Sequence, residues 1–274
     1  MRSILIPAAL ILPVVTPPAS AQREATAAAA SGDADELARK VSNPAAFMIS
    51  VPVHTDLDFG NWPDGSSRRY LLDIEPVIPV RLTRGWNMIS HTDFPLAYAD
   101  PVGPGGGVFG LGDINQTLSF TPAGRKGFIW AIGAQASLPT ATNDRLGSGK
   151  MSIGPSLLLL AQAKSFTAGV SADHLWSIAG PRDRADVSAT EIQPFFAWHI
   201  GGGRTISTNL DLSYDWKADQ WEVPLSLSFS KVTKIGKQAV SLSLGGKYWA
   251  ETPRDGSKWG LKAGVVLLFP QTVR

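Results

Sequence analysis

Apolar and polar residues alternate along most of the chain. From Ile206 to Trp216, the even-numbered residues are apolar or nearly so, and the odd-numbered ones are serine, asparagine or aspartate. A period of two is typical of a β-strand whose two faces meet different surroundings. The pattern recurs in twelve segments. We place the strands near residues 47–59, 69–82, 86–96, 110–120, 127–139, 150–162, 166–178, 189–200, 204–216, 221–232, 238–250 and 259–269.

The connections between these segments alternate in length. Short ones read LTRG, AKS and IGGG, whereas longer ones read GNWPDGSS, ADPVGPGGG and ETPRDGSK. Short turns on one rim and longer loops on the other are typical of an outer-membrane β-barrel. The sequence therefore predicts an all-β fold, an antiparallel up-and-down transmembrane barrel of about twelve strands. The even number of strands places both chain ends on the short-turn, periplasmic side.

Periodicity alone does not separate this barrel from a soluble β-sandwich, in which the apolar face would point inward. Aromatic residues favour the membrane, because they gather at both ends of the apolar face and match the two interfaces of a bilayer. Near the long loops these are Phe59, Tyr70, Phe94, Trp176, Trp216, Trp221, Tyr248 and Trp259. Near the short turns they are Trp86, Phe120, Phe128, Phe166, Trp198, Phe229 and Phe269.

Four polar residues break the apolar face: Ser90, Thr92, Gln116 and His174. A register error or a β-bulge would explain each of them.

The start of the chain predicts export. Arg2 precedes an apolar run from Ile4 to Val15, and Ala19–Ala21 offers a small-residue cleavage site, so residues 1–21 form a signal peptide. Residues 22–45 follow as a periplasmic leader, either unstructured or with a short helix from Asp33 that ends before Pro44 and could plug the lumen. The barrel then occupies residues 46–274.

Composition excludes several classes of protein. Export permits disulfides, but the chain has no cysteine, so a small disulfide-stapled module is excluded. Removing Arg2 with the signal peptide leaves 24 basic against 23 acidic residues, without the basic cluster that nucleic acid requires. Lys150 is followed by Met151 rather than Ser or Thr, so the stretch RLGSGKMS fails the phosphate-loop pattern.

Candidate chemistry is sparse. The four histidines form no metal-ligand pair, and the outward His174 has no serine within reach on its strand face, so we expect no metal, no cofactor and no enzymatic activity.

The polar faces carry many acids. We predict that they form a lumen that selects against anions or binds a polar ligand, and the alternative is a set of structural ion pairs and solvated acids. Lys150 and Lys262, with Lys247, balance only part of the charge, and His54 lies on the same face. The candidate solute-pathway residues are Asp56, Asp58, Asp73, Glu75, His91, Asp93, Asp113, Asn115, Asp173, Asp211, Asp215 and Lys247.

Several short motifs together resemble a family of outer-membrane barrels associated with the meta-cleavage pathway of phenol degradation, often labelled transporters or neuromedin-U-like. They include NPAAFMISVP (43–52), IEPVIPV (74–80), GLGDI (110–114), LGSGK (146–150), QWEVPL (220–225), SKVTKIGKQ (230–238) and LLFP (267–270). The resemblance covers roughly Leu37 to Pro270. It implies a barrel in the outer membrane and passage of small molecules, and it supplies no catalytic residues.

We therefore expect a monomeric barrel in the outer membrane of a Gram-negative bacterium, with membrane lipid and a small solute as its partners and no nucleic acid. Its expected function is passive passage of small solutes, aromatic or other small organic compounds among them. The alternatives are a closed barrel with a loop-based binding or structural role, and a soluble periplasmic sandwich.

Overall fold

The computed structural model of the protein describes residues 32–61, 67–99, 107–253 and 256–269. The predicted signal peptide, parts of three long loops and residues 270–274 lie outside these residues. The described strands are β1 (Ile49–Asn61), β2 (Ser67–Ile74), β3 (Val77–Arg81), β4 (Trp86–Ala99), β5 (Val108–Leu111), β6 (Ile114–Pro122), β7 (Phe128–Leu138), β8 (Met151–Gln162), β9 (Phe166–Ala179), β10 (Ser188–Gly201), β11 (Arg204–Leu210), β12 (Leu212–Asp215), β13 (Gln220–Ile235), β14 (Gln238–Glu251) and β15 (Trp259–Phe269).

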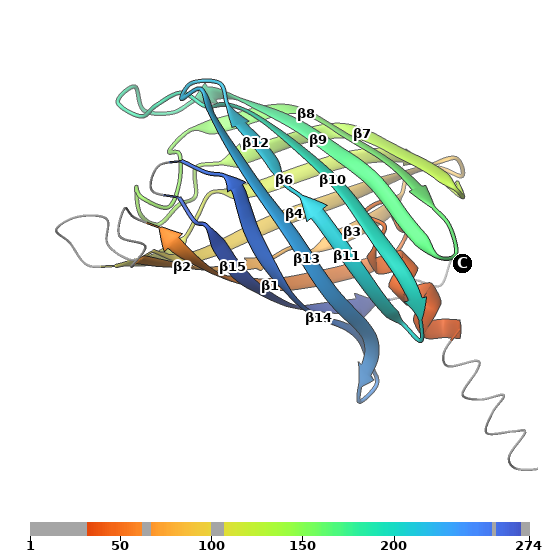
Figure 1. Cartoon of the computed structure of the whole chain (residues 1–274). Coiled ribbons are helices and arrows are strands. Elements are labelled where there is room, and N and C mark those ends of the chain that lie inside the picture. The colour runs from red at the N-terminus through yellow and green to blue at the C-terminus, as the bar shows by residue number, and fades with distance from the viewer. Residues whose placement is uncertain (1–31, 62–66, 100–106, 254–255, 270–274) are drawn as a thin grey trace, which may run out of the picture.

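These fifteen strands form one closed barrel with twelve strand positions (Figure 1). Neighbouring strands pair antiparallel, and β15 closes on β1 with Val53 opposite Val265. Three positions hold two short strands each, because β2 and β3 both pair with β4, β5 and β6 also both pair with β4, and β11 and β12 both pair with β10. The predicted segments 69–82, 110–120 and 204–216 each span one of these broken strands, so the prediction of a barrel of about twelve strands is confirmed.

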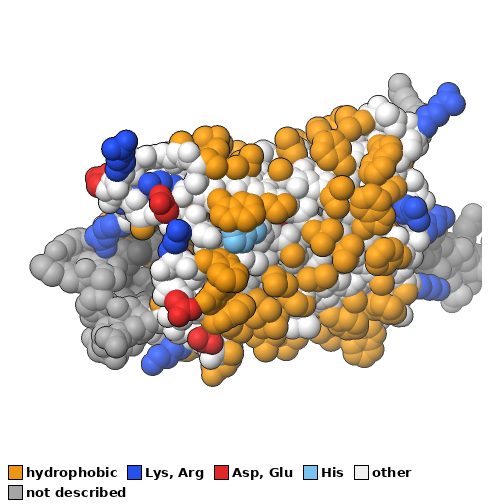
Figure 2. Space-filling model, turned by 90° about the horizontal axis from the view of Figure 1, so that it is seen from above, with side chains coloured by type: hydrophobic (Ala, Val, Ile, Leu, Met, Phe, Trp, Pro, Cys, Tyr) orange, Lys and Arg blue, Asp and Glu red, His pale blue; other side chains and the backbone are white. Residues whose placement is uncertain are grey.

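The apolar side chains point outward. Leu244 is 68% exposed and Leu227 is 61% exposed. On the face seen in Figure 2, hydrophobic side chains cover the flank of the barrel, whereas charged side chains lie near its two ends. Aromatic side chains mark the rims, as where Phe59 stacks on Trp259 with ring centroids 4.2 Å apart. A soluble sandwich would bury this face, and the structure rules that alternative out.

Three of the polar residues on the outer face satisfy one another. The Thr92 hydroxyl donates to the Gln116 side-chain oxygen at 2.6 Å, and the Gln116 amide donates to the Ser90 hydroxyl at 3.1 Å. The pairing of β4 with β6 is continuous there, so the expected register error or bulge is wrong. Internal hydrogen bonds are what allow these polar groups to face an apolar medium.

His174 follows the same rule near the long-loop rim. Its Nδ1 lies 2.7 Å from the Thr190 hydroxyl, which also accepts a hydrogen bond from the Trp216 indole at 2.8 Å. The His174 ring lies against the Trp176 ring, with centroids 4.0 Å apart. Thr190 sits directly opposite His174 in regular pairing, so no bulge places the histidine on the outer face.

The chain before β1 enters one end of the barrel. Residues 32–41 are helical, and the helix ends before Pro44 as expected, although Asp33 lies inside it. Figure 1 shows the helix at the end of the barrel where the β10–β11 turn lies. Within the described residues, no helix is both long enough and apolar enough to cross a membrane. We call residues 32–48 the N-terminal segment.

The N-terminal segment reaches opposite walls of the barrel. On one side, Ala38 and Met48 form a small buried core with Val232, Val266 and Leu268. On the other side, the Gln162 amide donates to the Arg39 carbonyl at 2.8 Å. Gln162 belongs to β8 and Leu268 to β15, which lie six positions apart around the barrel of twelve. The N-terminal segment therefore spans the lumen at the short-turn end.

Candidate solute pathway

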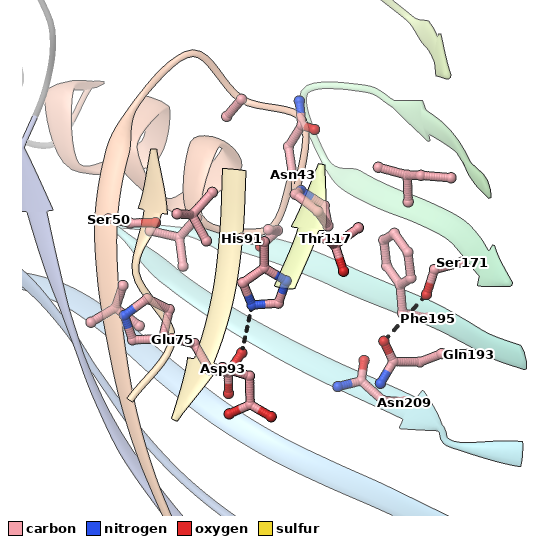
Figure 3. Close-up of a pocket in the computed structure, with 18 of the residues that line it drawn as sticks. Asn43, Ser50, Glu75, His91, Asp93, Thr117, Ser171, Gln193, Phe195 and Asn209 are labelled. Atoms are coloured by element: carbon pink, nitrogen blue, oxygen red, sulfur yellow. Dashed lines mark hydrogen bonds and ion pairs between the residues drawn. The ribbon is translucent and has the colours of Figure 1, made fainter. Parts of the chain in front are cut away.

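The lumen holds a cavity of about 660 Å³ above the N-terminal segment. Its wall is largely polar because each strand turns its serine, threonine, asparagine or acidic residues inward. Figure 3 shows Asn43 of the N-terminal segment at one boundary of the cavity and Glu75, His91 and Asn209 around it. The charged residues and histidines that line it are Asp73, Glu75, Asp93, Asp173, Glu191, Lys40, Lys262, His54 and His91.

One wall of the cavity comes from β2, β4 and β6. The His91 Nε2 lies 3.2 Å from the Glu75 carboxylate (Figure 3). Glu75 lies in the break between β2 and β3, where Pro76 lacks the N–H that would continue the strand. Next to this pair, the Asn115 amide donates to Asp93 at 3.4 Å. On this wall Glu75 and Asp93 thus each have one hydrogen-bond partner, and Asp73 adds a further carboxylate.

The facing wall comes from β9, β10 and the β11–β12 position. Asp173 and Glu191 sit directly opposite each other in the pairing of β9 with β10. Two residue pairs further along, the Ser171 hydroxyl donates to Gln193 at 3.4 Å, and the Gln193 amide donates to Asp211. Of the predicted pathway residues, six line the cavity: Asp73, Glu75, His91, Asp93, Asn115 and Asp173.

Three other predicted residues pack into a buried ion-pair cluster outside the cavity. Lys247 binds Asp56, and the guanidinium of Arg69 lies 3.0 Å from Asp58, which is 0% exposed. Lys247 also lies over the ring of Trp249, at 5.3 Å from its centroid. The charges of this cluster balance, which favours the structural reading of these acids over direct contact with a solute.

Asp113 holds a loop rather than lining the cavity. It accepts hydrogen bonds from the backbone N–H and the hydroxyl of Ser148, at 2.7 and 2.8 Å, and from the Ala141 N–H at 3.2 Å. The loop over residues 139–150 is thereby fastened to the break between β5 and β6.

Asp215 likewise serves a turn. It accepts from the N–H groups of Lys217 and Ala218 at 2.8 and 3.1 Å, at the end of β12. Its side chain is exposed and does not line the cavity.

A salt bridge joins two of the long loops at their rim of the barrel. Lys150 lies 3.0 Å from Asp186, and the hydrogen bond and positive charge of this lysine hold the pKa of the Asp186 carboxyl below its usual range. Lys150 itself is almost fully buried, so it does not balance the acids of the cavity as its sequence position suggested.

Sequence reasoning missed Glu191 and Gln193. On β10 the inward positions continue as Phe195 and Ala197, and this apolar continuation hid the polar face. Trp249 was missed because Tyr248, its neighbour, takes the outward position, while Trp249 points inward and donates to Glu222 at 2.9 Å. The local alternation of the polar Glu191 and Gln193 with the apolar Ile192 was a sequence signal for this inward face.

Among the described residues, no group of three or more histidine, aspartate or glutamate side chains gathers where it could hold a metal ion.

A closed antiparallel barrel with an apolar outer face, aromatic rims and a polar interior is a transmembrane β-barrel of the outer membrane. Solved structures share this fold. An outer membrane channel from Pseudomonas putida F1 is 13% identical, with a TM-score of 0.64 over 81% of this chain and 95% of that chain. The NanC porin is 10% identical, with a TM-score of 0.54 over 81% of this chain and 100% of that chain.

An outer membrane phospholipase from Salmonella typhi also matches, at 10% identity and a TM-score of 0.50 over 88% of this chain and 98% of that chain. Identities this low establish the shared fold alone, since both channels and an enzyme use it. No protein-family model matches the chain, and no curated protein matches it in sequence. The resemblance to the phenol-pathway family therefore stays an expectation.

Proposed function

We propose that the protein is a channel for passive passage of small solutes across the outer membrane. The observation that carries the proposal is the polar cavity of about 660 Å³ inside the barrel. A barrel of about eight strands is filled by its own side chains, whereas a barrel of twelve leaves room for a lumen. The volume lies in the range of sites that accept small organic molecules.

The charges of the cavity favour cations over anions. Five carboxylates line it, against two lysines, and one of these, Lys40, is already paired with Glu36 at 2.7 Å. Rings of acidic side chains are a common basis of cation preference in channels. Small aromatic compounds enter as candidate solutes through the family resemblance alone, and the aromatic ring of Phe195 in the wall offers one surface for them.

The N-terminal segment acts as a plug in this proposal. It crosses the lumen at the short-turn end, with a buried apolar core on one wall and hydrogen bonds to the other. Passage through the full chain then depends on how far the plug leaves its seat. We expect small conductance steps from the full chain and larger ones when the plug is displaced.

The test is the reversal potential of the purified, folded barrel in a planar bilayer under a KCl gradient. We expect discrete steps with cation preference, and a weaker preference for Asp73→Asn. Asp211→Asn should act in the same direction, because Asp211 lies on the facing wall. The heat-dependent gel mobility of each variant serves as the control for folding.

The rival function is a closed barrel whose loops bind a ligand or serve a structural role. One observation favours it: Asp113 fastens the loop over residues 139–150, and Arg184 donates to the carbonyls of Ser148 and Asp144 at 3.0 and 2.9 Å. A folded barrel that carries no current, with or without the plug, would support this rival.

A further inference from the structure

At the end of the barrel that carries the long loops, the two halves of the lumen differ in how tightly their side chains pack. On the side of β13, β14, β15, β1 and β2, inward residues are buried although they are polar: Asp58 is 0% exposed, Asp56 is 4% and Ser226 is 2%. Trp249, also inward, is 4% exposed. Close-packed side chains leave no room for water or ions. Toward the long loops this half of the lumen is therefore packed, whereas nearer the N-terminal segment its strands still line the cavity, through Asp73 and Lys262.

The other half is open to water. On β10, the inward side chains of Glu191 and Gln193 are both exposed, although the barrel encloses them. Both residues line the cavity, together with Asp173 and Ser171 of β9. The open part of the lumen near the long loops thus lies along β9 and β10, and the cavity wall continues along β11 toward the N-terminal segment.

The charge balance of the two halves differs as well. In the closed half, Lys247 and Arg69 neutralise Asp56 and Asp58. In the open half, the described residues provide no hydrogen bond or ion pair to the Glu191 carboxylate. Its nearest cross-strand partner in the pairing of β9 with β10 is another acid, Asp173.

The geometry points to a solute path along the wall of β9, β10 and β11, with Glu191 as the residue that contributes most to cation preference. This inference rests on the proposed channel function. A carboxylate that faces water without a counter-charge acts on every passing ion, whereas a paired one is largely cancelled by its partner. Asp93 and Glu75, across the cavity, share their charge with Asn115 and His91, so they contribute less.

The first experiment measures the ratio of potassium to chloride permeability. We expect Glu191→Gln to lower this ratio about fivefold, which corresponds to about 1 kcal/mol for the loss of one charge near water. Glu222→Gln is the matched control, since a glutamine there still accepts the hydrogen bond from Trp249 and should leave the ratio within twofold of wild type. An unchanged ratio in Glu191→Gln, with a reduced ratio in Asp73→Asn, would overturn the inference and leave the channel function standing.

The second experiment does not depend on current. The chain has no cysteine, so an introduced cysteine is the only thiol. In the folded barrel, a small cationic thiol reagent should modify Glu191→Cys rapidly and Ser226→Cys at least about tenfold more slowly, because burial blocks access to a thiol. Equal rates would overturn the assignment of the path, whatever the conductance. A barrel that stays silent in the bilayer would contradict the channel function itself.

Discussion

Asp35 accepts a hydrogen bond from the backbone N–H of Gly203 at 2.6 Å, although 168 residues separate them. This contact ties the helix of the N-terminal segment to the turn between β10 and β11. It joins a helix that precedes the barrel to the rim that the barrel builds much later in the chain. This hydrogen bond adds to the buried core and to the Gln162 contact that hold the N-terminal segment, so its loss should loosen the plug.

Asp35→Ala should increase passage through the barrel. A hydrogen bond to a charged group contributes about 1.5–3 kcal/mol, so its loss should raise the population of the displaced plug by about 10- to 150-fold. The measurement is the open probability in single-channel recordings. Asp33→Ala is the control, because Asp33 lies exposed on the same helix. Equal open probabilities for the two variants would show that the Asp35 contact does not hold the plug.

Gly203→Ala should loosen the plug through a steric clash, without removing a charged group. A Cβ at Gly203 would lie 2.9 Å from the Ala34 Cβ, closer than carbon atoms can pack, and its φ is +71°. Gly201→Ala in the same turn provides the matched control, because its φ is +87° and nothing lies within 4 Å. Both variants carry the backbone strain of a left-handed residue. We expect only Gly203→Ala to increase the rate of liposome swelling in a small sugar, and a similar increase in both would attribute the effect to the turn.

Lys247→Ala should destabilise the barrel. It leaves Asp56 uncompensated in a site that is 4% exposed, with Asp58 close by. Removing one partner of a buried ion pair typically costs about 3–5 kcal/mol. The shift of the urea midpoint, followed by gel mobility in detergent, measures this cost. Lys262→Ala, in the wall of the cavity, should shift the midpoint much less, and equal shifts would argue against a packed, dry cluster around Lys247.

Gln116→Leu should destabilise the barrel although it places an apolar residue on the apolar face. Thr92 and Ser90 would each lose their hydrogen-bond partner, at about 1–3 kcal/mol for an unsatisfied buried group. The triple variant Ser90→Ala, Thr92→Val, Gln116→Leu should recover most of the loss, because no polar group is then left unpaired. The urea midpoint again reports the result. A triple variant less stable than Gln116→Leu would mean that this face does not meet lipid.

The sequence predicted the barrel well because its signal is local. Alternation with a period of two is set by the geometry of each strand, so even the broken strands at Pro76 and Asp211 were recognised as single segments. The orientation of the apolar face followed from the aromatic rims, which a soluble protein would have no reason to place there.

The candidate site was predicted only in part, because side chains that share a face differ in their partners. Asp58 and Asp73 both point inward, but Arg69 and Lys247 neutralise the first, and the second lines the cavity. Such pairs depend on which residues of neighbouring strands face each other, and alternation along one strand does not reveal this. Glu191 was not predicted because the inward face of its own strand continues with the apolar Phe195 and Ala197, which made that face look apolar.

The most direct test of the central claim is the ionic current of the folded barrel in a planar bilayer under a KCl gradient. It is recorded for the chain from residue 22 onward and for the same chain without residues 22–45. The account predicts small steps from the first, larger steps from the second, and reversal potentials on the cation side for both. No current from either folded barrel, or a reversal on the chloride side, would contradict it.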